Sequence, residues 1–262
     1  MGESAVDGLD VFRSYMKGLE GSYAIIGGTA CDILLSDADL PFRATHDLDV
    51  VLVANNKLPN TARAIWQLVK DGGYSCAWGQ GERVCFYRFT NPKTSGYPRM
   101  LELFSKEPDF LAGSEDVKVA PLHVNDEDVS SLSAILLNDD YYKLLLDGIC
   151  TVRGISILDV PYLIPFKAKA YLDLKARRER AGDVDAHKVR KHLNDVLRLA
   201  QLLAGNERVE IPVSVYRDVN SFVLACEKEP VRLKQIGVAG ISMKEIIATL
   251  KSVYVNSALL MS

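Results

Sequence analysis

Two acidic residues, Asp47 and Asp49, stand one residue apart at the head of an apolar run in the stretch THDLDVVLV. Because side chains of a strand alternate between its two faces, this spacing places both carboxylates on one face. Neighbouring carboxylates repel each other, and Mg²⁺ relieves this repulsion because it prefers hard oxygen ligands together with substrate phosphates. Taken alone, however, the pair also fits an ordinary acidic strand start in which Thr45 or Asp47 caps a turn.

A glycine pair, Gly27-Gly28, follows the apolar run 23–26 and precedes a predicted helix that ends near residue 35. The start of a helix presents backbone N–H groups and a positive dipole, and glycine lets a phosphate approach the backbone closely. Thr29 adds a hydroxyl group and is also placed to cap the helix. The spacing matches neither a Walker loop nor a dinucleotide fingerprint, and a glycine pair can also end a strand for packing reasons alone.

A third carboxylate, Glu102, lies inside the apolar segment RMLELFS, which has the composition of a strand. A charged residue among such neighbours must be exposed on one face or paired. We therefore expect Glu102 to be a third metal ligand or a general base on a neighbouring strand, or else an outward-facing residue of an edge strand. His46 points to the opposite strand face from Asp47, so we interpret it as structural or substrate-lining rather than as a ligand.

Composition restricts the class of protein. The chain has 262 residues, of which 48% are hydrophobic and 25% charged, and its formal net charge of −3 does not indicate a general affinity for nucleic acids. Its five cysteines form no CxxC pair, which fits reduced thiols. No apolar stretch approaches the roughly 20 residues of a membrane span, and the N-terminal segment lacks the basic start and apolar core of a signal peptide. We expect a cytoplasmic protein without membrane contact.

Periodicity divides the chain into an α/β half, residues 1–125, and a mostly helical half, residues 126–262. In the first half the pattern predicts helices over 8–19, 29–35 and 60–70, and strands over 23–26, 48–53, 75–78, 83–90, 99–104 and 117–124. In the second half it predicts a helix within 131–150 and helices over 160–182, 183–203, 213–226 and 243–256. The predicted fold class is α+β, a mixed sheet with flanking helices followed by a helical domain.

The glycine pair, the acidic pair and the later strand glutamate together resemble the nucleotidyltransferase fold of the polymerase-β-like superfamily. In that fold GG or GS holds the triphosphate, and DxD with a third carboxylate holds magnesium. The segment LIPFKAKAYLDLKARRERAGDVDAHKVRKHLNDVLRL, residues 163–199, resembles the C-terminal signature of AbiEii-type nucleotidyltransferase toxins. Many members have Lys-Asp-x-x-Asp in the second of these helices. Here His192 takes the place of the first acid, between Lys191 and Asp195.

The resemblance implies a role for each matching residue. Magnesium would be held by Asp47, Asp49 and Glu102, the β- and γ-phosphates of an NTP would be bound by Gly27, Gly28 and Thr29, and further nucleotide contacts would come from Arg43, Lys167, Lys169, Lys191 and Asp195, with Lys167 counted among the catalytic residues. Helical spacing also allows a simpler interpretation, because Lys169 and Asp173, like Lys191 and Asp195, are four residues apart and can form surface ion pairs. Lys167 differs because it lies in the mostly apolar stretch LIPFKAKAYL, so it either snorkels or faces an anion.

The resemblance therefore implies a magnesium-dependent enzyme that transfers a nucleoside monophosphate from an NTP to an acceptor such as tRNA or a protein hydroxyl. It also implies the toxin of a toxin–antitoxin pair, with an antitoxin protein as its partner. The alternative is a catalytically silent relative that acts as a binding or regulatory partner, which the exchange at His192 keeps open. The spacing of the motifs identifies neither the acceptor nor the preferred base.

Overall fold

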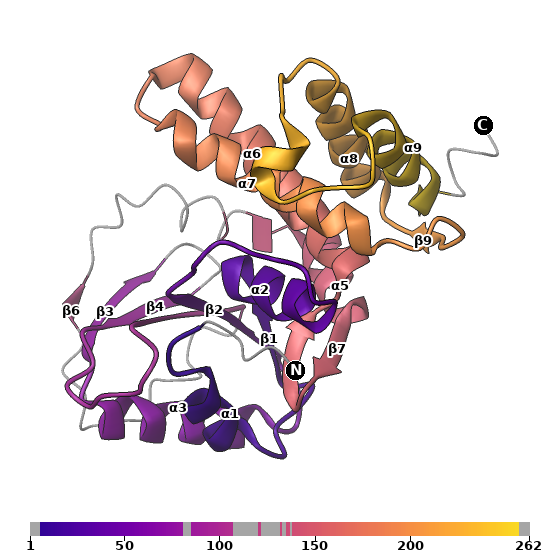
Figure 1. Cartoon of the computed structure of the whole chain (residues 1–262). Coiled ribbons are helices and arrows are strands. Elements are labelled where there is room, and N and C mark those ends of the chain that lie inside the picture. Colours follow the sequence, from indigo (N-terminus) through magenta and orange to yellow (C-terminus); the bar gives the residue numbers. More distant parts are fainter. Residues whose placement is uncertain are drawn as a thin grey trace. The chain divides into compact units, whose positions relative to one another are not determined.

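The computed structural model describes residues 6–80, 85–106, 120–121, 132, 135–136 and 138–256, with the backbone alone for 76–80, 85–86 and 120–121. The chain divides into two compact units, which Figure 1 shows. The first unit consists of residues 1–125 and 149–158, and the second of residues 126–148 and 159–262. The first contains a mixed sheet and the second is mostly helical, so the predicted α+β class is confirmed.

A mixed sheet forms the first unit. Within the described residues it has eight strands in the order β6-β3-β4-β5-β2-β1-β8-β7. Strand β2 lies at its centre, antiparallel to β1 and parallel to β5, and β5 is in turn antiparallel to β4. The strands are β1 (Tyr23–Ile26), β2 (Asp47–Leu52), β3 (Ser75–Gln80), β4 (Cys85–Thr90), β5 (Met100–Ser105), β6 (Ala120–Pro121), β7 (Ile149–Val152) and β8 (Ile155–Leu158).

Helices cover both faces of this sheet, with α2 (Gly27–Asp37) on one side and α1 (Leu9–Met16) and α3 (Leu58–Gly72) on the other (Figure 1). Aromatic contacts hold α1 and α3 against the sheet. The ring of Phe12 lies 5.6 Å from that of Tyr23, and the ring of Trp66 lies 5.9 Å from that of Phe89. Since alternate residues of a strand face opposite ways, the neighbour of Phe89 on β4, Arg88, faces the side of the sheet on which α2 lies.

The sequence analysis did not predict the β7–β8 hairpin, nor the pair of short strands in the second unit. The hairpin joins its strands through Arg153 and Gly154, whose φ angles of 51° and 76° are those of a tight two-residue hairpin turn. Strand β8 pairs with β1, so residues 149–158 belong to the sheet and not to the helical half to which we assigned them. Of the strand predicted over 117–124, only residues 120–121 lie within the described part of the chain.

The second unit is built on the long helix α6 (Val160–Ala181), which packs against α7 (Ala186–Leu199) and α8 (Val213–Cys226). Asp159 and Asp185 cap α6 and α7 through side-chain hydrogen bonds to backbone N–H groups. The remaining elements are α5 (Asp139–Asp147), α9 (Met243–Val253), two short 3₁₀ helices (Ala200–Leu202 and Leu233–Ile236) and a parallel pair of strands, β9 (Val209–Glu210) and β10 (Tyr254–Val255). In the described residues, no helix is long and apolar enough to cross a membrane.

A buried tyrosine compensates for a proline inside α6. Pro165 has no N–H group, so the carbonyl of Pro161 one turn earlier lacks its helical donor. The Tyr254 hydroxyl donates a hydrogen bond of 2.8 Å to this carbonyl oxygen. Tyr254 is 2% exposed, and burial raises the pKa of its hydroxyl well above its ordinary value, so the group stays a donor. Tyr254 thus supplies the hydrogen-bond donor that the Pro161 carbonyl does not receive from its own helix.

We predict that Tyr254→Phe lowers the free energy of unfolding by about 1–3 kcal/mol, because the Pro161 carbonyl is then buried without a donor. In a Pro165→Ala background the restored N–H group can bond to that carbonyl, so the same tyrosine substitution should cost less. Urea denaturation of the four proteins in this double-mutant cycle measures the difference. Equal costs in both backgrounds would contradict the prediction.

Candidate active site

The glycine pair touches the acidic pair directly. Strands β1 and β2 are antiparallel with Ile26 opposite Asp49, so Gly27 follows its strand at the point where β2 begins. A Cβ atom on Gly27 would lie only 1.8 Å from Oδ2 of Asp49, and the φ angle of Gly27 is +71°. Glycine is therefore required at this position for two reasons, the left-handed backbone and the space that the Asp49 carboxylate occupies.

Gly28 lies beside a hydroxyl and a guanidinium group. A Cβ atom at this position would lie 2.7 Å from Oγ1 of Thr45 and 3.3 Å from a terminal nitrogen of Arg43. The Arg43 guanidinium also lies over the ring of Phe42, 4.9 Å from its centroid. An anion placed on the backbone N–H groups at the start of α2 would thus have the positive charge of Arg43 beside it. The structure brings the predicted residues Gly28 and Arg43 together.

The Thr29 hydroxyl bonds to strand β2 and does not cap its own helix. Thr29 is fully buried within α2, which begins at Gly27 without a side-chain cap, so the expected capping role of Thr29 is wrong. Its hydroxyl instead donates a hydrogen bond of 2.7 Å to the backbone carbonyl of Asp47. Thr29 therefore fixes the first turn of α2 to the first residue of β2, which positions the glycine pair relative to the acidic pair.

A row of charged side chains crosses the centre of the sheet. Asp49 of β2 lies opposite Glu102 of β5, and Glu102 lies opposite Arg88 of β4. Residues opposite each other share a face, and Asp47 shares it too because it is two residues from Asp49. The Nε and one terminal nitrogen of Arg88 both lie 2.6 Å from Oε1 of Glu102. Glu102 is 6% exposed, so it is not the outward-facing residue of the alternative interpretation.

Burial raises the pKa of Glu102 above its ordinary value, and the negative charge of Asp47 acts in the same direction. The hydrogen bond with Asp49 and the guanidinium of Arg88 oppose this shift. Burial is the largest of these effects, so the net direction of the pKa shift of Glu102 is upward.

Glu102 already has protein partners in this structure, Arg88 among them. Within the described ranges, no group of three or more His, Cys, Asp or Glu side chains could hold a metal ion. The role of Glu102 as a third ligand stays a prediction. Asp47 and Asp49 remain partly exposed on one face of β2, and two carboxylates with substrate phosphates are a normal donor set for Mg²⁺. The residues present thus fit a two-carboxylate magnesium site.

Arg88 is the residue of this site that the sequence analysis missed. Its signal is a single cation in the aromatic strand segment CFYRFT, followed by a single anion in the next apolar strand segment, MLELFS. Opposite charges in the centres of two consecutive strands are typical of a cross-strand pair. His46 is exposed beside Asp47, and its structural or substrate-lining role stays a prediction.

The predicted residues of the helical half form a separate group within the second unit. Lys167 of α6 lies 3.2 Å from Oδ2 of Asp195 on α7, and Arg198 lies 3.3 Å from Oδ1. Lys167 is 4% exposed and Asp195 is completely buried. The structure therefore gives Lys167 a protein carboxylate as its anion, and Asp195 bonds to these two cations rather than forming the expected surface pair with Lys191. Phosphate binding by Lys167 stays a prediction.

Lys169 and Lys191 occupy more accessible positions. Lys169 pairs with Asp173 at 2.6 Å on the surface of α6, as the four-residue spacing predicted. Lys191 is partly buried on α7, next to the partly buried His192. Nucleotide contacts by these two lysines stay predictions.

The chain is similar to solved structures but not to family models or curated sequences. No family model matches the chain, and no curated protein matches its sequence. A crystal structure of an antigenic nucleotidyltransferase-like protein from Paracoccidioides brasiliensis is similar with a TM-score of 0.43 and 16% sequence identity, over 96% of this chain and 94% of the other. With so low a score, the functional argument depends on the site geometry itself.

The contact between Gly27 and Asp49 leads to a prediction with a matched control. Gly96 also has a positive φ, +83°, but a Cβ atom there would meet nothing within 4 Å. Gly96→Ala should therefore cost only the strain of a left-handed alanine, about 1–2 kcal/mol. Gly27→Ala should cost more and should weaken binding of Mg²⁺·NTP, because the methyl group displaces the Asp49 carboxylate. Urea denaturation and calorimetry measure the two effects, and equal behaviour of the two variants would contradict the prediction.

Proposed function

We propose that the first unit is the catalytic centre of a nucleotidyltransferase, which moves a nucleoside monophosphate from an NTP to an acceptor hydroxyl. The observation that carries this proposal is the direct contact of Asp49 with the Gly27 backbone. This contact supports the proposal because nucleotidyl transfer requires a phosphate-binding turn next to carboxylates that can hold a cation.

Each residue has a role in this proposal. The backbone N–H groups at Gly27 and Gly28 bind the β- and γ-phosphates, and Arg43 neutralises part of their charge. Asp47 and Asp49 would hold magnesium, which when bound stabilises charge on the α-phosphate and activates the attacking hydroxyl. Arg88 holds Glu102, and Glu102 in turn orients Asp49, as partners of metal-binding carboxylates commonly do.

The resemblance of the helical segment 163–199 to AbiEii-type toxins extends the proposal to the acceptor and to regulation. The acceptor would be tRNA or a protein hydroxyl, and an antitoxin protein would bind the chain and suppress transfer. The helical unit would contribute Lys169 and Lys191 to nucleotide binding. Its buried pair of Lys167 and Asp195 supports a structural role for these two residues.

The experiment that tests the proposal is incubation of the purified chain with Mg²⁺ and each of four α-labelled NTPs, together with RNA and protein fractions of a cell extract. Label that enters one fraction identifies the class of acceptor and the base. Calorimetric titration with Mg²⁺·NTP separates the alternatives. Binding without transfer supports a catalytically silent nucleotide-binding protein, and the absence of both overturns the assignment.

A further inference from the structure

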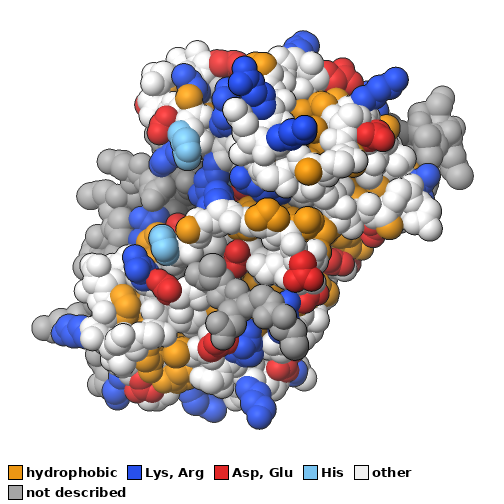
Figure 2. Space-filling model, in the orientation of Figure 1, with side chains coloured by type: hydrophobic (Ala, Val, Ile, Leu, Met, Phe, Trp, Pro, Cys, Tyr) orange, Lys and Arg blue, Asp and Glu red, His pale blue; other side chains and the backbone are white. Residues whose placement is uncertain are grey.

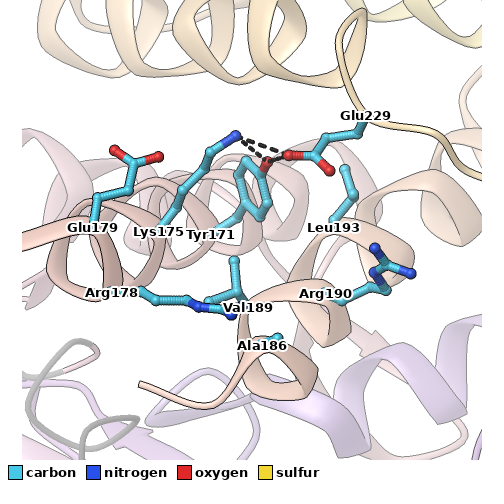
Figure 3. Close-up of a pocket in the computed structure, with 9 residues that line it drawn as sticks. All are labelled: Tyr171, Lys175, Arg178, Glu179, Ala186, Val189, Arg190, Leu193 and Glu229. Atoms are coloured by element: carbon cyan, nitrogen blue, oxygen red, sulfur yellow. Dashed lines mark hydrogen bonds and ion pairs between the residues drawn. The ribbon is translucent and has the colours of Figure 1, made fainter. Parts of the chain in front are cut away.

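A pocket of about 310 Å³ opens in the second unit, between α6, α7 and the segment that follows α8 (Figure 3). All of its lining residues belong to this unit, so it shares no residue with the glycine and carboxylate site of the first unit. The buried side chains of Val189 and Leu193 provide an apolar wall. The remaining lining side chains are mostly charged, and include Lys175, Arg178, Glu179, Arg190 and Glu229.

One lysine and one glutamate of this pocket neutralise each other. Nζ of Lys175 lies 2.8 Å from Oε1 of Glu229 and 3.2 Å from the Tyr171 hydroxyl, which also donates to Glu229 at 2.9 Å (Figure 3). The hydrogen bond that Lys175 donates to Glu229 lowers the pKa of the glutamate and raises the pKa of the lysine, so both side chains stay charged. Because this triad is internally balanced, it neither attracts nor repels an anion strongly.

Two guanidinium groups carry the remaining positive charge. Arg178 of α6 extends towards Val189, and Arg190 of α7 stands on the other side of that residue (Figure 3). Both are exposed, and among the described residues neither forms an ion pair or a hydrogen bond to a side chain. Glu179, the other acid of the pocket, points away from both (Figure 3).

The surroundings of the pocket strengthen the positive charge. Residues 160–199 contain ten Lys and Arg against five Asp and Glu, although the whole chain has a net charge of −3. Figure 2 shows Lys and Arg side chains over the helical unit, on the face where α6 and α7 lie in Figure 1. A local excess of this sign raises the concentration of anions near the two arginines.

We propose that this pocket binds a small phosphate ester, with the phosphate between Arg178 and Arg190 and the organic part against Val189 and Leu193. A phosphate monoester carries a charge near −2 at neutral pH, which matches two guanidinium groups, and their planar N–H forks suit its oxygens. The volume exceeds what a free phosphate fills and lies at the lower end of the range for ligand pockets, about 300–1,000 Å³. The apolar wall accounts for the rest of the ligand.

Calorimetric titration of the whole chain with AMP, in the presence of EDTA, tests the proposal. Arg178→Gln and Arg190→Gln should each weaken AMP binding by about tenfold or more, because each removes a charge-assisted pair of hydrogen bonds. Arg180→Gln is the matched control, since Arg180 lies exposed on the same helix outside the pocket and donates to the Ala176 carbonyl. Glu229→Gln should tighten binding several-fold, because it removes a negative charge and releases Lys175 towards the phosphate.

Two further titrations distinguish a phosphate ester from free phosphate and from RNA. Inorganic phosphate should bind more weakly than AMP, and equal binding would overturn the role of the apolar wall. A 12-nucleotide RNA that binds where AMP does not would overturn the proposal in favour of a nucleic-acid surface. Equal losses in Arg180→Gln and Arg178→Gln would show a general charge effect and would also overturn it. The Asp47→Asn/Asp49→Asn variant should keep AMP binding, so failure of the catalytic proposal remains distinguishable from failure of this one.

Discussion

Replacement of both Asp47 and Asp49 by asparagine is expected to reduce transfer of a nucleoside monophosphate from Mg²⁺·NTP by about a thousandfold or more. The reason is that a bound metal contributes several kcal/mol of transition-state stabilisation, and these two residues are the partly exposed carboxylates on the face of the sheet beside the glycine pair. Rates of label transfer in the wild type and in the variant measure the effect.

The fold should survive this change. Asparagine has nearly the same shape as aspartate, and the substitution removes the repulsion between neighbouring carboxylates, so the free energy of unfolding should fall by little or even rise. Asp37→Asn/Asp71→Asn is a control with the same change in charge, because Asp37 lies at the end of α2 distant from Gly27 and Asp71 lies on α3. Retained transfer in the Asp47→Asn/Asp49→Asn protein would contradict the proposal that these two residues bind magnesium.

The parts of the site that are close in the chain could be predicted from the sequence. The strand 23–26, the glycine pair after it and the acidic pair at the head of the next strand depend on local patterns, and β1 has the predicted bounds. The hairpin of β7 and β8 also had a local signal. Its Arg153-Gly154 turn separates two β-rich runs, although the sequence analysis assigned no strand there.

The parts that depend on register could not be predicted in this way. Alternation along β5 indicates which face Glu102 occupies, but only the pairing of β5 with β2 and β4 places it between Asp49 and Arg88. The same difficulty applies to Thr29. Its spacing after the glycines suited a helix cap, whereas the packing of α2 against β2 gives its hydroxyl to the Asp47 carbonyl. The hydroxyl thus bonds to the neighbouring strand and not to the start of its own helix.

Asp195→Asn is expected to lower the free energy of unfolding by about 3–5 kcal/mol, the usual cost of breaking a buried ion pair by removal of one partner. Asp195 is fully buried between Lys167 and Arg198, so an amide in its place removes the negative charge that faces both cations. Asp173→Asn removes the partner of Lys169 in a partly exposed pair and should cost only about 0.3–0.5 kcal/mol. Urea denaturation of the two variants measures the contrast, and similar costs would contradict it.

Variants of the Lys167–Asp195 pair distinguish a structural role of Lys167 from a catalytic one. Lys167→Met leaves Asp195 with the guanidinium of Arg198, so it should destabilise less than Asp195→Asn. The double variant Lys167→Met/Asp195→Asn removes one cation together with the carboxylate and should recover part of the lost stability, because only Arg198 stays charged and it keeps its hydrogen bond to the Ile236 carbonyl. If Lys167 only supports the helical unit, nucleotidyl transfer returns together with stability in this double variant. If transfer stays lost while stability returns, Lys167 acts on the nucleotide, as the resemblance to the AbiEii-type toxins implies.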